Sequence, residues 1–355
     1  MTMWPNSVDR PTLLRRLRAR NQEKSIFNLR HICKQLETIE NSFVMPQMEG
    51  QQAGPPYVPN VAGVGGRPTT LPDIPIIAVF LFIYVCGAAS NMTIFQLNRR
   101  KGHKFIPSVA MFGFCMSRIA TFTLRLVWAT RPTNAKIAIA AQIFVNVGVL
   151  IIYIIVLLLC VRLFRATHPR LGWYPLISRG LKVLYVLLFC AIVLVIAFTI
   201  QSFYTLDMTL RKDAMWIQRA SILYMLIFNV ISLVLYTWAV LLPPASNHEN
   251  FGNSSMLSKK IILGVALFFT LFIAGFRTGT TWAPSRPANN PAWYQSKAAF
   301  YTIEMAFEIV VVYLFIFTRF DKKFWIPNGS KGPGDFSRVQ GEVEDKPSRV
   351  SDTSV

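Results

Sequence analysis

Seven long apolar segments constrain the fold of this chain more than any other feature of its sequence. They lie near residues 74–98, 105–130, 136–162, 181–204, 215–242, 261–282 and 298–319. Each is long enough to cross the apolar core of a bilayer, which takes about 20 residues of helix. Proline stands at their edges and not in their interiors, so we expect helices without proline kinks. The sequence therefore predicts an all-α, polytopic membrane protein with a bundle of seven transmembrane helices.

The distribution of charge also fits a membrane protein. Hydrophobic residues make up 53% of the 355 residues, and the formal net charge is +20 at pH 7. The Lys and Arg residues lie in short clusters between the apolar segments and do not form one continuous surface. We therefore predict the lipid bilayer as a partner and no binding to nucleic acid. The predicted location is integral to the plasma membrane or an endomembrane.

Lys and Arg predict the orientation of the bundle as well. They are more frequent in the connections after the first, third and fifth segments and in the stretch after the seventh than in the other connections. Short loops rich in Lys and Arg stay on the cytoplasmic side of a membrane. The sequence thus predicts that the N-terminus lies outside and the C-terminus is cytoplasmic.

The ends of the chain differ in composition from its apolar middle. Residues 1–73 are predicted to form a polar, basic, largely disordered N-terminal tail followed by a Gly- and Pro-rich linker. Residues 74–319 are the predicted seven-helix transmembrane domain, and residues 320–355 a disordered cytoplasmic tail. The stretch that begins at Met48 also resembles the start of a protein. The sequence therefore leaves open whether translation starts at Met1 or at Met48.

Two arginines interrupt the second apolar segment. Arg118 and Arg125 are seven residues apart, which places them on one face of a helix. A charge at the centre of a bilayer costs about 2.5–3.5 kcal/mol on insertion scales, so polar partners are expected opposite this face. Glu304 and Glu308 lie one turn apart in the seventh segment, at the depth of the two arginines. We predict that these carboxylates pair with the arginines.

Other polar residues gather at similar depths. Gln142 and Asn146 share one face of the third segment, Arg219 and Asn229 lie in the fifth, and Arg277 in the sixth. Two interpretations are open. The Arg and Glu residues are structural ion pairs with the amides as contacts between helices, or they line an outward-facing cavity for a polar or anionic ligand or a proton-coupled path.

The sequence lacks the common patterns of catalytic and metal sites. It contains no HExxH, GxSxG or P-loop pattern. Every histidine lies in the N-terminal tail or in a connection, which argues against haem or a histidine-based metal site within the membrane. These residues are His31, His103, His168 and His248. We therefore predict no enzyme, no cofactor and no metal.

Several stretches carry a resemblance to a known group of proteins. They are PPYVPNVAGVGGRPTTLPDIP, NRRKGHKFIPSVAMFGFCMSRIATFTLRLVWA, RLFRATHPRLGW, FRTGTTW and FYTIEMAFEIVVVYLFIFTRFDKKFW. Together they span about residues 55 to 327, and they resemble a family of fungal seven-helix membrane proteins of unknown function, sometimes labelled receptor-like. Phe276-Arg277 and Glu304 are also similar in layout to fungal lipid-translocating exporter-like (RTA-like) proteins. The resemblance implies a seven-helix fold and no particular activity.

Three functions remain as hypotheses. The first is a receptor-like sensor of an unknown small-molecule or lipid ligand, with a cytoplasmic signalling partner at loops 99–104 and 162–182. The second is a transporter or lipid translocator that uses the intramembrane Arg/Glu layer. The third is a structural membrane protein.

Overall fold

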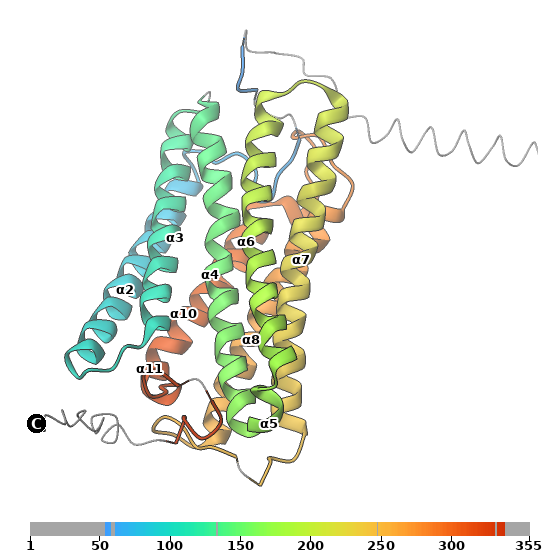
Figure 1. Ribbon diagram of the computed structural model, residues 1–355. Helices are drawn as coiled ribbons and strands as arrows, with labels where there is room; N and C mark the ends of the chain where they lie inside the picture. Colours follow the sequence, from blue (N-terminus) through green and yellow to red (C-terminus); the bar gives the residue numbers. More distant parts are fainter. Residues whose placement is uncertain (1–53, 58–60, 133, 247, 331, 338–355) are drawn as a thin grey trace, which may run out of the picture.

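The computed structural model describes residues 54–57, 61–132, 134–246, 248–330 and 332–337. Within them it forms a bundle of helices and no β-strands, and seven spans are long and apolar enough to cross a membrane (Figure 1). These are α2 Asp73–Arg100, α3 Ile106–Thr130, α4 Ala135–Thr167, α6 Pro175–Tyr204, α7 Met208–Leu241, α8 Met256–Trp282 and Lys297–Phe317. By length and composition they indicate an integral membrane protein. The predictions for residues 1–53 and 338–355, including the start at Met48, lie outside the described residues.

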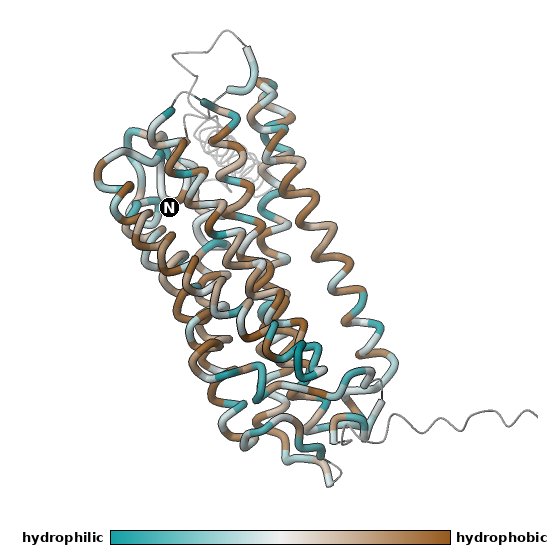
Figure 2. The backbone as a smooth tube through the Cα atoms, turned by 90° about the vertical axis from the view of Figure 1, so that its left-hand side faces the viewer, coloured by the Kyte–Doolittle hydropathy of each residue, from teal (hydrophilic) through white to brown (hydrophobic). Residues whose placement is uncertain are grey.

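The most buried span, α4, forms the centre of the bundle. It packs against α3, α6, α7 and α8, whereas α2 packs chiefly on α3 and on the last span. With 33 residues, α4 is about 50 Å long and exceeds the apolar thickness of a bilayer. Figure 2 shows apolar residues along the helices and polar residues gathered in the connections at the two ends.

The two ends of the bundle hold different segments of the chain. The linker end holds residues 61–72, the α3–α4 and α6–α7 connections and residues 283–296. The tail end holds the α2–α3 and α7–α8 connections, α5 Pro169–Gly172 and α11 Phe320–Lys323. The charge pattern predicts that the linker end is the outer one.

Several helices extend beyond the apolar segments, because polar capping residues and prolines set their ends. Asp207 accepts a hydrogen bond from Thr209 N, which starts α7 seven residues before the predicted position 215. Asn134 caps α4 in the same way, and Pro175 occupies the first turn of α6. For these helices, the apolar run locates the span and underestimates its length.

The last span is not a continuous α-helix. It consists of α9 Lys297–Ala299, the π-helix η2 Phe300–Ala306 and α10 Phe307–Phe317. A π-helix widens the turn and changes which side chains share a face, and it occurs often at functional sites. Glu304 lies inside η2, and Glu308 follows at the start of α10. The simple i, i+4 geometry predicted for these glutamates is thus altered.

The predicted linker is folded back over the bundle. Gly65 N donates to the Gln295 carbonyl at 3.1 Å, and Ala62 N donates to the Arg286 carbonyl at 2.9 Å. Gly65 has a φ of +76°, and a Cβ atom there would lie 2.7 Å from the ring of Phe300. Only glycine satisfies both restrictions at this position. Residues 61–72 are therefore part of the packed domain.

A polar cluster ties the start of α2 to the start of the last span. Asp73 is fully buried, and its Oδ2 accepts hydrogen bonds from Lys297 Nζ at 2.5 Å and Thr69 N at 2.7 Å. Tyr301 donates to Oδ1 at 2.8 Å. The carboxylate is thus satisfied on both oxygens, which offsets the cost of its burial.

The packed part of the chain continues beyond residue 320, where the sequence predicted a disordered tail to begin. The predicted boundary is therefore too early. Phe320, Phe324 and Phe336 are buried against the bundle. Asp321 accepts hydrogen bonds from Asn98 at the end of α2 and from Arg319. Burial raises the pKa of Asp321, but these hydrogen bonds and the Arg319 charge outweigh it, so the pKa lies below its ordinary value. The apolar phenylalanines explain why this polar-looking segment packs.

Glu249 holds the segment around Phe336 in place. Its two carboxylate oxygens accept hydrogen bonds from Gly334 N and Phe336 N, each at 2.8 Å, and the side chain is buried. We expect Glu249→Ala to expose the segment to protease by destabilising it about 1–3 kcal/mol, because two backbone donors lose their acceptor. Limited proteolysis of the purified protein measures this. Glu249→Gln keeps one acceptor and is the milder control; equal cleavage of Glu249→Ala and wild type would contradict the prediction.

Candidate functional site

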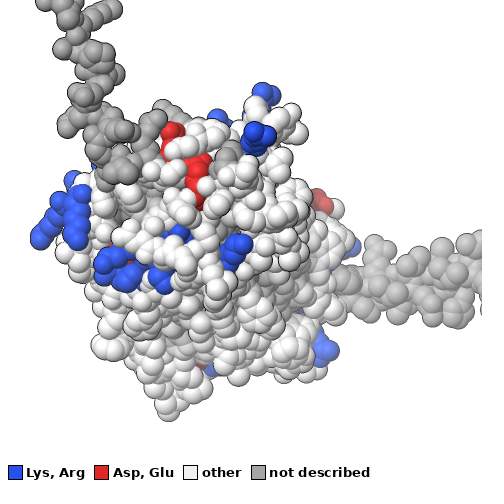
Figure 3. Space-filling view, turned by 90° about the horizontal axis from the view of Figure 1, so that it is seen from below, with Lys and Arg blue, Asp and Glu red and all other residues white. Residues whose placement is uncertain are grey.

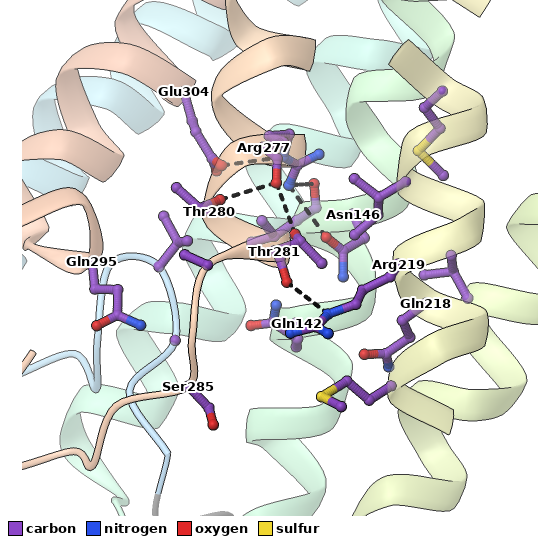
Figure 4. A pocket seen from close by; sticks show the side chains of 18 of the residues that line it. Gln142, Asn146, Gln218, Arg219, Arg277, Thr280, Thr281, Ser285, Gln295 and Glu304 are labelled. Carbon is purple, nitrogen blue, oxygen red and sulfur yellow. Dashed lines mark hydrogen bonds and ion pairs between the residues drawn. The ribbon is translucent and has the colours of Figure 1, made fainter. Parts of the chain in front are cut away.

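A cavity of about 290 Å³ lies inside the bundle near the linker end (Figure 4). Side chains of α4, α7, α8, η2 and the linker line it. A second cavity of about 720 Å³ shares several of these lining residues, so the two adjoin each other. The second one is bounded by Asn289 and Pro291, which are exposed at the linker end. The second cavity therefore reaches that end, beside the inner one.

The inner cavity ends near the middle of the bundle. Tyr153 of α4, Met225 of α7 and Ala274 of α8 are its lining residues farthest toward the tail end. About one turn beyond them, Val156 and Phe228 are fully buried in the apolar core. The position of Tyr153 corresponds to about 27 Å along α4 from its first residue. The packed core thus closes the cavity on this side.

Arg277 of α8 dominates the polar wall. Its Nε donates to Glu304 Oε1 at 3.1 Å, and its Nη2 donates to the Asn146 side chain at 3.3 Å (Figure 4). Nη2 also donates to the Val145 carbonyl at 3.1 Å. One guanidinium thereby connects three helical segments, α8, α4 and η2. The sequence placed Arg277, Glu304 and Asn146 at similar depths, and the structure brings them into contact.

Arg219 supplies a second guanidinium to the same cavity from α7. Its Nε donates to the Thr281 carbonyl at 3.2 Å, and its Cζ lies over the rings of Trp216 and Trp282. Gln142 also lines the cavity, on the wall that α4 forms. The predicted residues Arg219 and Gln142 therefore belong to the site together with Arg277.

Two buried polar atoms at this cavity have no hydrogen-bond partner among the described residues. They are Glu304 Oε2 and the Tyr153 hydroxyl, on side chains that are 3% and 1% exposed. Both residues line the inner cavity. Buried polar groups are normally paired with protein atoms, ordered water or a bound ligand. These two atoms therefore mark where a molecule in the cavity finds hydrogen-bonding partners.

Arg118 and Glu308 form a fully buried ion pair beside the cavity. Arg118 Nε and Nη2 donate to the two carboxylate oxygens of Glu308 at 2.6 and 2.5 Å. The side chains are 0% and 1% exposed. Tyr84 donates to the same carboxylate at 3.3 Å. This bidentate geometry is the strongest arrangement for such a pair, and the low dielectric of the surroundings strengthens it further.

The Val145 carbonyl connects this ion pair to the cavity. Arg118 Nη1 donates to it at 3.2 Å, and Arg277 Nη2 donates to it at 3.1 Å. A chain of contacts thus runs from Glu308 through Arg118, the backbone of α4 and Arg277 to Glu304. These contacts link the wall of the cavity to the centre of the bundle.

Four predicted site residues lie outside both cavities: Arg118 and Glu308, which form the ion pair described above, and Arg125 and Asn229. Arg125 does not pair with Glu304 as the sequence predicted; its Nη2 donates to the Gly65 carbonyl at 3.1 Å and its Cζ lies 4.4 Å from the Phe300 ring centroid. Glu304 contacts Arg277 instead. Asn229 donates to the Met225 carbonyl within α7. Matching depth alone predicted the Arg125 pair, but the folded linker and Phe300 occupy the space around this guanidinium.

Several residues of the site were not predicted from the sequence. Tyr153 lies within a long apolar stretch of α4, where its hydroxyl was the only signal. The Val145 and Thr281 carbonyls act through the backbone, and Gln295 enters the site because residues 283–296 cover it. Among the described residues, no three His, Cys, Asp or Glu side chains lie together as metal ligands.

Comparison with known proteins supports a family resemblance over part of the chain. Residues 252–325, which hold α8, the last span and α11, match a family model described as a protein of unknown function (DUF3112). No curated protein and no solved structure matches the chain. Arg277, Glu304 and Glu308 lie in the matched segment. The fungal, receptor-like and RTA-like parts of the resemblance stay predictions, and the description of the family assigns no activity.

The buried ion pair is tested by reversing its charges. Arg118→Glu places two carboxylates together, and we expect a loss of at least about 3–5 kcal/mol of stability, the cost of leaving a buried charge unpaired. Glu308→Arg on the same chain restores the pair and should recover much of the loss. The yield of monodisperse protein in detergent and its thermal denaturation measure both effects. Arg131→Glu at an exposed position is the charge control, and a double variant as unstable as Arg118→Glu would contradict the pairing.

Gly148 permits the close approach of α3 and α4 at this pair. A Cβ atom there would lie 2.8 Å from Ser117 Oγ and 3.0 Å from Arg118 Nη1. We expect Gly148→Ala to destabilise the protein by about 1–3 kcal/mol through overpacking. Gly113→Ala on α3 is the matched control, because nothing lies within 4 Å of its Cβ position. Thermal denaturation compares the two variants, and equal effects would rule out a packing role for Gly148.

Proposed function

We propose that this protein is a receptor-like membrane sensor that binds a small polar ligand in the cavity at the linker end. The observation that carries the proposal is the inner cavity itself, where two guanidiniums, amides and two unpaired buried atoms surround about 290 Å³ of space. Ligand sites combine such an apolar cavity with a few converging polar groups. A purely structural role for the ion pairs would not explain why polar groups surround a cavity.

The proposal assigns binding and no catalysis to these residues. A cavity near one end of the bundle and closed by packed core on its other side fits a sensor, because the ligand enters and leaves on the same side. The charge distribution supports an outer location for the linker end. For the membrane that contains the protein, we keep the prediction made from the sequence, which is the plasma membrane or an endomembrane.

A signal has a physical route in this arrangement. A ligand at Arg277 competes for the hydrogen bonds that this residue donates to Val145 and Glu304. Glu304 belongs to the π-helix, a form that is rare in proteins and occurs often at functional sites. The span continues through α10 to the tail end. Ligand binding would thus alter the position of α10 at the opposite end of the bundle.

The tail end is the proposed site of a cytoplasmic partner. Figure 3 views this end and shows separate groups of Lys and Arg side chains with few acidic ones. The predicted partner loops, 99–104 and 162–182, lie here, and Arg99, Arg100 and Lys101 are exposed. A partner with an acidic or polar surface fits this end.

A transporter is the second candidate. The π-helix and the buried Arg/Glu layer favour it, since intramembrane ionisable residues often mark substrate or proton paths. A lipid translocator belongs to the same class. A transporter requires a second state in which the cavity opens at the tail end.

The sensor proposal is tested by identifying what the cavity retains. We expect a small molecule to co-purify with the wild-type protein in mild detergent and to fall at least about tenfold in Asn146→Leu, which removes a polar group from the wall. Mass spectrometry of extracts measures this. Glu249→Gln at the tail end is the control, and equal recovery from all three proteins would refute the cavity as the site.

The compound found in this way separates the two candidates. Reconstituted in liposomes, a sensor binds the compound without moving it, whereas a transporter produces flux that Asn146→Leu reduces. Accumulation of the compound inside wild-type liposomes above empty ones would reject the sensor in favour of the transporter.

A further inference from the structure

The polar lining of the inner cavity indicates the chemical class of the ligand, an inference that rests on the proposed binding function. Uncharged amide and hydroxyl side chains contribute to this lining from α4, α7, α8 and residues 283–296 (Figure 4). They include those of Gln142, Asn146, Gln218, Thr280, Thr281 and Ser285. Amide and hydroxyl groups both donate and accept hydrogen bonds. Such a lining suits a ligand that binds through hydrogen bonds and carries no net charge.

The charged groups of the cavity are already engaged by the protein. Arg277 Nε and Glu304 Oε1 form an ion pair at 3.1 Å. Arg219 donates to the Thr281 carbonyl, and its guanidinium lies over two tryptophan rings. An anionic ligand would come close to the Glu304 carboxylate, and a cationic one would come close to two guanidiniums. Repulsion between like charges is strong at low dielectric, so both signs of net charge are disfavoured.

The groups that remain for a ligand include acceptors as well as donors. Glu304 Oε2 is an acceptor without a partner among the described residues. Asn146 accepts from Arg277 through its carbonyl oxygen, which leaves its amide nitrogen to donate. The exposed Gln142 side chain and the buried Tyr153 hydroxyl make no hydrogen bond with the part of the chain that the structure describes. A hydroxyl group both donates to a carboxylate and accepts from an amide, so several hydroxyls satisfy this set.

Apolar side chains complete the lining, and they limit what the ligand carries between its polar groups. Val195 of α6 and Ile222 and Met225 of α7 contribute hydrocarbon surface. A sugar ring presents C–H groups between its hydroxyls, which such surface covers without leaving a polar group unpaired. The volume of about 290 Å³ is near the lower end of the range of about 300–1,000 Å³ that is usual for ligand pockets. The cavity therefore suits one small ring.

We propose that the ligand is an uncharged polyhydroxyl compound of monosaccharide size. Its hydroxyl groups donate to Glu304 Oε2, accept from the amides of Asn146 and Gln142 and pair with the Tyr153 hydroxyl. Its C–H groups lie against α6 and α7. A charged derivative of the same ring places a like charge beside Glu304 or the guanidiniums. A ring without hydroxyls leaves these polar groups unpaired.

Three hexoses and their derivatives test this ligand class. D-glucose, D-galactose and D-mannose are each compared with the corresponding 2-amino sugar, which is cationic, and the corresponding uronate, which is anionic. Tetrahydropyran supplies the ring without hydroxyls. Equilibrium dialysis measures binding to the full-length protein in lipid nanodiscs. At least one hexose should bind, and at least about tenfold more tightly than its charged derivatives and tetrahydropyran, because a site built for hydroxyl groups rejects analogues that lack them.

Tyr153→Phe separates a ligand contact from a structural one. Because this hydroxyl has no partner among the described residues, its loss should leave the thermal denaturation of the ligand-free protein unchanged or raise the Tm. Binding of the hexose should nevertheless weaken about three- to tenfold, as expected for one hydrogen bond. Thermal denaturation and dialysis on the same preparations measure the two effects.

Gln142→Leu removes a second group that faces only the cavity, and it should weaken hexose binding to a similar extent. Gln96→Leu is the matched control, because it makes the same exchange at an exposed position of α2 outside both cavities. It should leave hexose binding unchanged. The ranking of probes on the wild-type protein decides the ligand class even where a variant fails to fold.

Several outcomes overturn the ligand class. They are no binding of any hexose, equal or tighter binding of a charged derivative or of tetrahydropyran, unchanged hexose binding in folded Tyr153→Phe or Gln142→Leu, or an equal loss in Gln96→Leu. The proposed function fails separately, through equal recovery of co-purified compounds from wild type and Asn146→Leu. A compound that Asn146→Leu loses, but that carries a net charge or lacks hydroxyl groups, preserves the cavity as a binding site and rejects the class assigned here.

Discussion

The ion pair between Arg118 and Glu308 is the interaction on which the rest of this bundle depends. A guanidinium at mid-depth of an apolar helix is tolerated only where a partner compensates its desolvation, and Glu308 does so with two hydrogen bonds. This requirement links the last span to α3 through the ion pair and brings α4 close enough for its carbonyls to accept from the same arginine. Three spans are thereby fixed by one buried charge.

The cavity lies next to this pair and shares its chemistry. Arg277 repeats the role of Arg118 nearer the linker end, but its partners leave one oxygen of Glu304 and one nitrogen of the guanidinium without a hydrogen bond among the described residues. The pair between Arg118 and Glu308 has both carboxylate oxygens bonded, and it holds the helices together. The pair between Arg277 and Glu304 leaves Glu304 Oε2 without a partner among the described residues, which makes it suited to a ligand. We propose that the two interpretations left open by the sequence, structural pairs and a ligand cavity, apply to two different layers.

Part of this site was predictable because helix geometry is regular. Counting residues from the end of each span gave the depth of Glu308 opposite Arg118, and the pair is present. The same count failed for Arg125, since it says nothing of the rotation of a helix or of what folds over its end. Gly65 and Phe300 surround Arg125, and neither gave a signal in the sequence. The ordered segment around Phe336 was missed for a related reason, because its mixed composition hid a few apolar residues that pack.

The sequence by itself determined that this chain forms seven apolar helices and that its intramembrane charges need partners. Both follow from local hydropathy and from the cost of a charge in hydrocarbon, which depend on the chain alone. Only the tertiary structure decided which guanidinium meets which carboxylate, that the last span contains a π-helix, and that the linker closes over a cavity. Those choices depend on how neighbouring helices rotate and pack, and packing is a property of the whole bundle.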